Sequence, residues 1–148
     1  MTKRSKRFMP IQRLAKHGEN QAAQQLGRSK KALTEQEIRL QELVAYREEY
    51  AQQFHLTGQG GLDGRQLQSY QSFLNQLDIA IEQQKQKIIH AQQNCEERRV
   101  NWREKHTHSE VLNSAVKRIK VQEQKIEQRK EQRDNDEQAM RTRNTTTT

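Results

Sequence analysis

Hydrophobic residues after position 63 recur with the seven-residue period of a coiled coil. Two series of positions, each with a period of seven, contain twelve apolar or Cys side chains among sixteen, although only 30% of the chain is hydrophobic. Eight consecutive heptads at this spacing predict a long helix that buries one narrow seam. The series are Leu67, Leu74, Ile81, Ile88, Cys95, Trp102, Ser109 and Val116, and Tyr70, Leu77, Gln84, Ala91, Arg98, Lys105, Leu112 and Ile119.

The segment before this repeat has a less regular seam, which Arg47 interrupts. Pro10 suits the first position of a helix, where the missing N–H of proline is no loss. Gly18 and Gly27 weaken such a helix by about 1 kcal/mol each. The spacing predicts a helix over 10–57. Its apolar positions are Leu26, Leu33, Leu40 and Phe54, seven or fourteen residues apart, with Ala22, Leu43 and Tyr50 between them.

The run Thr57-Gly58-Gln59-Gly60-Gly61 is the strongest break in the chain. Gly58 suits a left-handed residue that ends a helix. Asp63 and Gln66 have the spacing of a capping box, which begins a helix. We therefore predict a bend over 58–63 and a second helix over 64–140.

A short glycine-rich connection favours antiparallel neighbours. We expect an all-α fold, a long antiparallel two-helix coiled coil (an α-hairpin rod) with a C-terminal helix overhang. With the bend near Gly61, the numbers of facing residues should sum to about 122. We expect a single coiled-coil domain over 1–143, and a disordered polar tail over 144–148.

Charge is unevenly distributed along the sequence. Residues 1–33 contain nine Lys and Arg and one acidic residue, residues 34–97 contain five basic and ten acidic residues, and residues 98–148 contain 13 basic and eight acidic residues. In a hairpin the two basic segments meet at one pole, which favours an acidic partner. The alternative is a solvated face that keeps a thin coil in solution. Nucleic acid is disfavoured, because Phe8 is the only aromatic residue near that pole.

Chemistry-bearing residues are sparse, and we expect no enzyme, no cofactor and no metal. His106 and His108 diverge on a helix, unlike the pair four residues apart that a helical metal site uses. The other histidines are His17, His55 and His90, and all five fit a surface position. Cys95 occupies a seam position and is typical of a small core residue. No segment approaches the ~18 apolar residues of a membrane span, so we expect no membrane insertion.

Near the bend the chain has more apolar residues than one seam can bury. If Leu40, Val44 and Phe54 face the second helix, a further stripe is left over. This stripe predicts a docking surface rich in Tyr and Phe. The alternative is a wider core, or a third helix from another chain. The stripe contains Leu43, Tyr46 and Tyr50 on the first helix, and Phe73, Leu77, Ala80 and Gln84 on the second.

Several runs resemble the flagellar FliJ family between about Pro10 and Met140. They are Tyr46-Arg-Glu-Glu-Tyr50, the glycine-rich bend, Tyr70-Gln-Ser-Phe73-Leu-Asn-Gln-Leu77 with Ile81, and Asn101-Trp102-Arg103-Glu104-Lys105. The resemblance implies a non-catalytic component of the bacterial flagellar type III export apparatus. Such a protein is cytoplasmic and peripheral at the cytoplasmic face of the inner membrane.

The resemblance also implies partners. The basic terminal ends of the coil would engage the ring of the export ATPase FliI. From the charge distribution, we place this contact at Arg13, Lys16, Lys117 and Arg118. The coil would also contact the export gate protein FlhA and handle export chaperones. The gate-contacting surface corresponds to Arg39, Leu43, Tyr46, Tyr50, Phe73, Leu77, Ala80 and Gln84, of which Arg39 and Gln84 depart from the family's usual residue type. The alternatives are a generic coiled-coil scaffold or chaperone and a nucleic-acid-binding coil.

Overall fold

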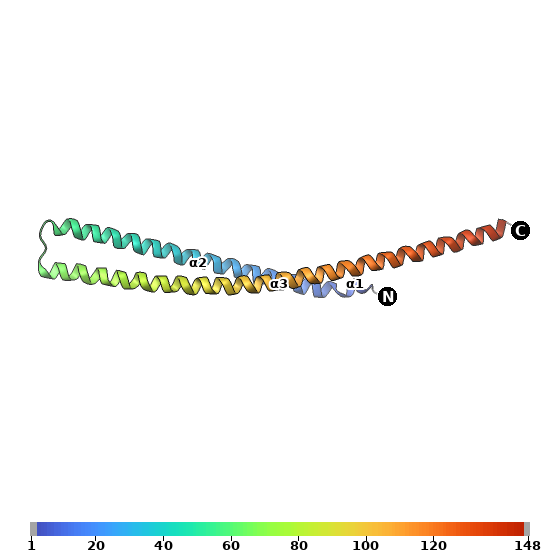
Figure 1. Cartoon of the computed structure of the whole chain (residues 1–148), viewed down its shortest axis with the longest axis horizontal. Helices are drawn as coiled ribbons and strands as arrows, with labels where there is room; N and C mark the ends of the chain where they lie inside the picture. Colours follow the sequence, from blue (N-terminus) through green and yellow to red (C-terminus); the bar gives the residue numbers. More distant parts are fainter. Residues whose placement is uncertain (1–2, 147–148) are drawn as a thin grey trace. The chain divides into compact units, whose positions relative to one another are not determined.

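The structure, a computed structural model, describes residues 3–146, and every secondary-structure element among them is a helix. The elements are α1 (Arg4–Arg7), α2 (Met9–Gly58) and α3 (Gly64–Thr146). The two long helices pack as an antiparallel hairpin, in which α3 has 83 residues and α2 has 50 (Figure 1). The prediction of an all-α hairpin with a longer C-terminal helix is confirmed.

Contacts within the chain divide it into two compact units. Unit 1 contains Met1–Gln21 and Arg103–Thr148, and unit 2 contains Ala22–Trp102. Both long helices contribute to both units, so each unit holds a piece of α2 beside a piece of α3. The interpretation of residues 1–143 as a single domain stays a prediction.

In unit 2, α2 faces α3 through positions that alternate three and four residues apart, which keeps one face of a helix against its partner. Val44 is 43% exposed and Leu43 is half-buried, so the expectation that Val44 lies in the seam is wrong. The seam continues from Leu40 by a step of three, and the next residue points about 100° away around the helix. The seam residues are Ala22, Leu26, Ser29, Leu33, Gln36, Leu40, Leu43, Arg47, Tyr50 and Phe54.

The predicted seam positions of α3 in unit 2 are buried or half-buried, except Leu67 and Arg98. Leu67 lies in the first turn of α3 after the bend. Arg98 lies at the edge of the seam, where its guanidinium donates a hydrogen bond of 3.1 Å to the side chain of Gln25. Cys95 is half-buried in the seam, as expected. The heptad repeat therefore identifies the face of α3 that packs on α2.

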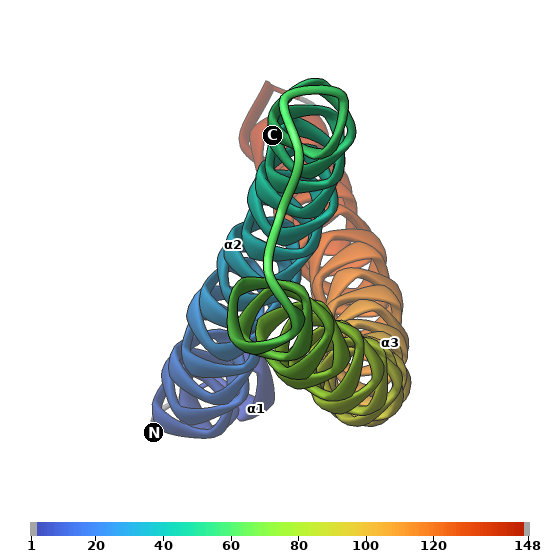
Figure 2. The same ribbon diagram turned by 90° about the vertical axis from the view of Figure 1, so that its left-hand side faces the viewer.

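The bend begins where α2 ends at Gly58 (Figure 2). The N–H of Gly60 donates to the carbonyl of Thr57, and the N–H of Gly61 donates to that of Gly58. These bonds continue the turn past Gly58 as far as Gly61, which is the left-handed residue, with a φ of 87°. The expectation of a left-handed Gly58 is therefore wrong. Only glycine takes such a φ without cost.

The capping box at the start of α3 is confirmed. The N–H of Gln66 donates to Asp63 Oδ1 at 2.8 Å, and the N–H of Asp63 donates to Gln66 Oε1 at 3.3 Å. Each side chain satisfies a backbone donor that the first turn of a helix leaves without a partner.

The antiparallel register of unit 2 follows from contacts spread along both helices. Gln36 contacts Gln84, and Tyr50 contacts Tyr70. Both pairs agree with a hairpin folded near Gly61. The predicted register is therefore confirmed in this unit.

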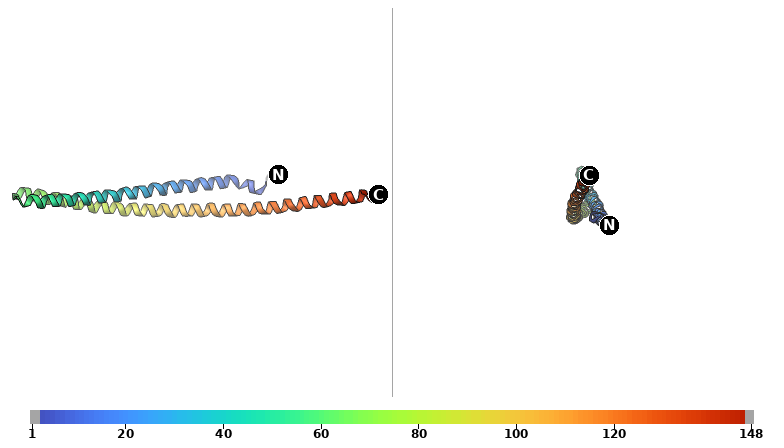
Figure 3. Two further views of the ribbon diagram at one scale, coloured as in Figure 1. Left: turned by 90° about the horizontal axis from the view of Figure 1, so that it is seen from above. Right: turned by 90° about the vertical axis from the view of Figure 1, so that its right-hand side faces the viewer.

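In unit 1, the N-terminal segment runs beside α3 (Figure 3). α1 lies before the predicted helix start at Pro10, and backbone hydrogen bonds continue through Phe8 into α2. Ser5 is buried, because its backbone N–H and its hydroxyl donate to the carboxylate of Glu123 at 2.9 and 2.7 Å. Contact with α3 therefore begins before the first residue of the predicted helix.

Beyond Glu123, α3 has no neighbouring helix within the described part of unit 1, and residues 124–145 are exposed. The hydroxyls of Thr142 and Thr145 donate to the backbone carbonyls four residues earlier, at 2.8 and 3.0 Å. The helix therefore includes residues 144–146, which overlap the predicted disordered tail. Thr147 and Thr148, the rest of that tail, lie outside the described residues.

Candidate docking surfaces

Aromatic rings from both helices of unit 2 gather near the bend. Tyr46, Tyr50 and Phe54 lie four residues apart on α2, so their side chains share one face. The rings of Tyr50 and Phe73 are closest, with centroids 4.5 Å apart, and the Tyr46 ring meets that of Phe73 edge-on at 6.2 Å. Tyr70 contacts Tyr50 at 5.2 Å and Phe54 at 4.9 Å. We call these five residues the aromatic cluster, and its spacings are those of favourable aromatic pairs.

The environment of the cluster keeps Tyr50 uncharged. Burial raises the pKa of the Tyr50 phenol, because the charged phenolate would lose hydration, and the neighbouring Tyr70 and Tyr46 raise this pKa further. The phenol therefore stays protonated at neutral pH.

The eight residues that the family resemblance assigns to the export gate all lie in unit 2, but they differ in accessibility. Arg39 and Tyr46 are exposed, Tyr46 by 49%. Leu77 and Gln84 are buried, at 7% and 5% exposure. The half-buried residues are Leu43, Tyr50, Phe73 and Ala80. A partner that approaches the intact hairpin can touch Tyr46 but not the buried pair.

Gln84 has a partner inside the chain. Its side-chain amide donates to the backbone carbonyl of Gln36 at 2.9 Å and to the side-chain carbonyl of Gln36 at 2.7 Å. These bonds form a polar layer within an otherwise mostly apolar seam. The sequence hinted at this buried polar contact, because Gln84 is a polar residue at a seam position of the heptad repeat.

Arg47 fills its seam position and reaches across to α3. Its guanidinium forms an ion pair with Asp78, through a short contact from Nε to Oδ1 and a longer one of 3.4 Å from Nη2 to Oδ2. The hydrogen bond to Asp78, helped by the negative charge of that carboxylate, raises the pKa of Arg47. The residue that interrupts the apolar pattern in the sequence therefore links the two helices beside the aromatic cluster.

The net positive charge of the chain lies in unit 1. This unit contains 17 Lys and Arg and nine Asp and Glu, whereas unit 2 contains ten of each. All four residues predicted to bind the ATPase ring, Arg13, Lys16, Lys117 and Arg118, belong to unit 1 and are exposed. The Lys16 ammonium also lies 3.5 Å from the carboxylate of Glu19. Unit 1 is therefore the basic surface of the protein.

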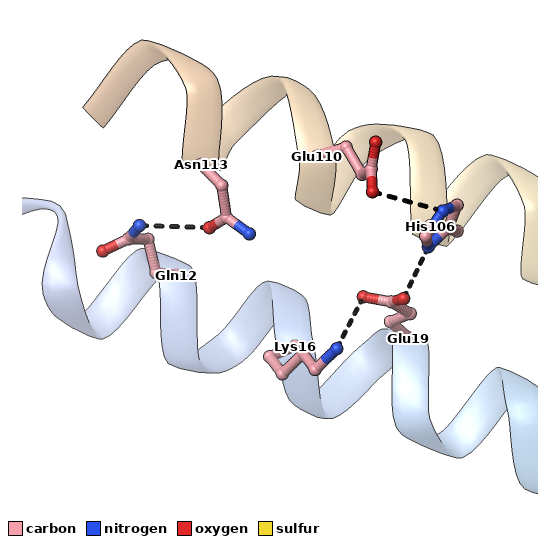
Figure 4. Close-up of polar contacts among 6 residues, drawn as sticks. All are labelled: Gln12, Lys16, Glu19, His106, Glu110 and Asn113. Carbon is pink, nitrogen blue, oxygen red and sulfur yellow. Dashed lines mark hydrogen bonds and ion pairs between the residues drawn. The ribbon is translucent and has the colours of Figure 1, made fainter. Parts of the chain in front are cut away.

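Polar side chains join α2 to α3 in unit 1 (Figure 4). The Gln12 amide donates to Asn113 Oδ1 at 3.1 Å, and Nδ1 of His106 lies 2.7 Å from Glu19 Oε1. His106 is half-buried with 39% of its side chain exposed, so its ring reaches the surface as predicted and also faces Glu19. Lys105, the predicted seam residue, is exposed, because the neighbouring position faces Glu19 instead.

Two carboxylates in this unit have lowered pKa values. The hydrogen bond to His106 is the main cause for Glu19, and bonds to Ser109 and the charges of Lys16 and His106 act in the same direction. The hydroxyl and backbone N–H of Ser5 lower the pKa of Glu123. Both carboxylates are therefore ionised at neutral pH.

Within residues 3–146, no three His, Cys, Asp or Glu side chains are grouped so that they could hold a metal ion. Among the same residues, no helix combines the length and the apolar character needed to cross a membrane.

The fold and the two surfaces define a helical hairpin of the coiled-coil class, with a basic unit and a neutral unit that carries an aromatic cluster. The family model described as Flagellar FliJ protein matches residues 4–146. The chain therefore belongs to the flagellar FliJ protein family and is a component of the flagellar export apparatus. No curated protein and no solved structure matches the chain.

Proposed function

We propose that the chain is a non-catalytic adaptor of flagellar protein export. Its basic surface in unit 1 binds the ring of the export ATPase FliI, and the accessible side of its aromatic cluster binds the export gate protein FlhA. In this role it works in the cytoplasm at the inner face of the membrane, and it handles export chaperones. One observation carries the proposal: the excess positive charge lies in unit 1, whereas the aromatic cluster lies in unit 2.

The basic surface supports an acidic protein partner. Unit 1 has an excess of eight positive charges, and its cations lie on both helices. Such a surface attracts an acidic partner over a distance of about 8–10 Å at physiological salt and orients it during approach.

The aromatic cluster supports a second, less charge-dependent contact. Tyr46 offers an exposed ring held against Phe73, so binding would cost little side-chain entropy. Tyrosine is enriched at protein interfaces, where its ring is buried and its hydroxyl finds a partner. The buried Leu77 and Gln84 would support this surface from below and make no direct contact with the gate.

The proposed contact with the ATPase ring is tested by substituting Glu for four basic residues, Arg13, Lys16, Lys117 and Arg118. We expect the variant to lose most of its stimulation of ATP hydrolysis and ring assembly, because four attractive charges become repulsive. The matched control reverses Lys30, Lys31, Lys85 and Lys87, four exposed lysines of unit 2, with the same change in net charge. Equal losses in the two variants would show that net charge, not the unit 1 surface, is recognised.

The proposed contact with the export gate is tested with Tyr46→Ala, and Ile79→Ala serves as the control. Both residues lie in unit 2 and are about half exposed, at 49% and 59%. We expect Tyr46→Ala to weaken binding to the cytoplasmic part of the gate by about tenfold or more, as for an interface hot spot, with helix content unchanged. Unchanged affinity would exclude Tyr46 from the interface.

Nucleic acid remains the competing partner for a basic surface. Titration with a DNA duplex at several salt concentrations tests whether the basic surface binds nucleic acid or the ATPase ring, because phosphate contacts make the affinity for DNA depend steeply on salt. We expect no specific binding at physiological salt. Tight binding there would overturn the assignment of the basic surface to the ATPase ring.

A further inference from the structure

His106 lies between two carboxylates that come from different helices. Its Nδ1 is 2.7 Å from Glu19 Oε1 on α2, and its Nε2 is 3.5 Å from Glu110 Oε1, one turn further along α3 (Figure 4). The Glu19 side chain is only 10% exposed, whereas that of His106 is 39% exposed. Solvent protons therefore reach an imidazole that is in contact with a nearly buried carboxylate.

The pairing of α2 with α3 in unit 1 depends heavily on such polar contacts. Val116 is the only buried hydrophobic residue among the described residues of this unit. The remaining buried residues of the unit are Ser5, Glu19 and Ser109. Little apolar burial is present to hold the helices together if the contact between Glu19 and His106 weakens.

The protonation state of His106 decides how many of its contacts are favourable. The imidazolium ion has two N–H donors, one for each carboxylate. The neutral ring has one donor, and its other nitrogen then turns a lone pair toward a carboxylate. The charged groups around the ring are Lys16 and Glu19 from α2 and Glu110 from α3. Arg118 lines the same surface hollow, of about 450 Å³, further along α3.

We propose that His106 is a proton-sensitive latch, which holds the N-terminal part of α2 on α3 when it is protonated and loosens this pairing when it is neutral. The proposal concerns the isolated chain and does not depend on which partners bind it. Loosening would leave Val116 and the neighbouring face of α3 open. Pairing would then be tighter in weakly acidic than in weakly alkaline solution, because the imidazolium ion can donate to both carboxylates and the neutral ring to only one.

The carboxylate sets the opposite limit of the pH window. The pKa of Glu19 is lowered from its ordinary value of 4.5, so this group contributes to pairing above that value. Its contribution is lost as the pH falls through the lowered pKa. The latch is therefore closed in weakly acidic solution and opens on either side.

The test measures the distance between spin labels in unit 1 at about pH 5.5 and about pH 8.5, on either side of the imidazole range. Arg13→Cys and Ser114→Cys carry the labels at exposed sites, in a Cys95→Ser background. We expect the population with separated helices to rise about 2- to 5-fold at the higher pH, as for a partly exposed ion pair. A second label pair in unit 2, at Ala32→Cys and Gln92→Cys, should not respond.

His106→Gln should remove the pH response, and the matched control His108→Gln, two residues away and exposed, should keep it. Glu110→Gln leaves the contact with Glu19 in place and should reduce the response without preventing folding. Circular dichroism checks that each variant is helical. A response that persists in His106→Gln, or its absence from the otherwise unaltered labelled protein, would overturn the proposal.

Discussion

The two units use the same two helices in different ways. In unit 2 the seam buries Ala22, Leu26, Leu77 and Ile88, and positive and negative charges are equal in number. In unit 1 the seam buries Val116 alone among its described hydrophobic residues, and polar contacts supply much of the pairing. Unit 2 is therefore held together mainly by apolar packing, whereas unit 1 depends on polar contacts and carries the net positive charge.

This difference has a physical consequence for how each unit responds to its surroundings. Apolar burial depends little on pH or salt near room temperature, whereas exposed ion pairs weaken as salt screens them. The pairing of helices should therefore be constant in unit 2 and adjustable in unit 1. The predictions below test this contrast, and the largest expected effect comes first.

Leu77→Ala should destabilise unit 2 strongly. The side chain is 7% exposed, and loss of a buried leucine lowers the free energy of unfolding by about 2–4 kcal/mol. Ile79→Ala, two residues away at 59% exposure, should cost less than about 0.5 kcal/mol. Urea unfolding followed by circular dichroism measures both. Similar costs for the two variants would show that the seam of unit 2 does not control stability.

Replacing the polar layer of unit 2 should stabilise the hairpin but make its alignment less unique. The double variant Gln36→Leu with Gln84→Leu removes both partners of the layer, so no amide is left unpaired. We expect the free energy of unfolding to rise by about 1 kcal/mol, while spin-label distances across the seam broaden. A narrow distance distribution in this variant would mean that the layer does not specify register.

Each interior glycine of α2 tests one unit. Gly18 belongs to unit 1 and Gly27 to unit 2, and a Cβ atom added at either position meets no neighbouring atom within 4 Å. Gly→Ala should therefore add about 0.5–1 kcal/mol of helix stability at each site. Hydrogen exchange of the backbone amides should slow in the substituted unit more than in the other. Equal slowing in both units would show that they unfold together.

Acid below the ordinary carboxyl pKa of 4.5 should release α1 from α3 and leave unit 2 intact. Ser5 lowers the pKa of Glu123 below 4.5, so this carboxylate contributes to pairing above its ordinary pKa. The contribution disappears as the pH falls through the lowered value. Protection of the backbone amides near Ser5 against hydrogen exchange, taken relative to the intrinsic exchange rate at each pH, should fall in acid. Glu123→Gln should show low protection already at neutral pH. Unchanged exchange in the variant would show that other contacts hold α1.

Local signals in the sequence predicted local structure well. The capping box of Asp63 and Gln66 was readable, because its residues lie three positions apart and interact within one turn. The heptad repeat identified the seam face of α3 for the same reason. Gly58 was assigned the left-handed conformation of Gly61, because several glycines follow one another and only the hydrogen bonds of the turn decide among them.

The candidate sites were harder to predict, because they depend on the opposite helix. Leu43 and Val44 are adjacent and both apolar, and only contact with α3 determines which one is covered. Two polar pairs join residues that are far apart in sequence, so no local pattern predicts them. Gln36 and Gln84 are 48 residues apart, and Glu19 and His106 are 87 residues apart. Tyr46 was correctly expected to be exposed, whereas the same reasoning placed the buried Leu77 on the surface.

The amide layer between Gln36 and Gln84 also bears on mechanical load. If α2 and α3 slid past each other by one heptad, about 10 Å, Gln84 would face Leu43 or Ser29 in place of its amide partner. Leu43 offers only its backbone carbonyl and no side-chain acceptor, and Ser29, whose hydroxyl donates to the carbonyl of Leu26, offers only a short hydroxyl oxygen. Slippage would therefore exchange the bond between the two side-chain amides for a poorer contact, so the layer opposes sliding of α2 along α3 in unit 2.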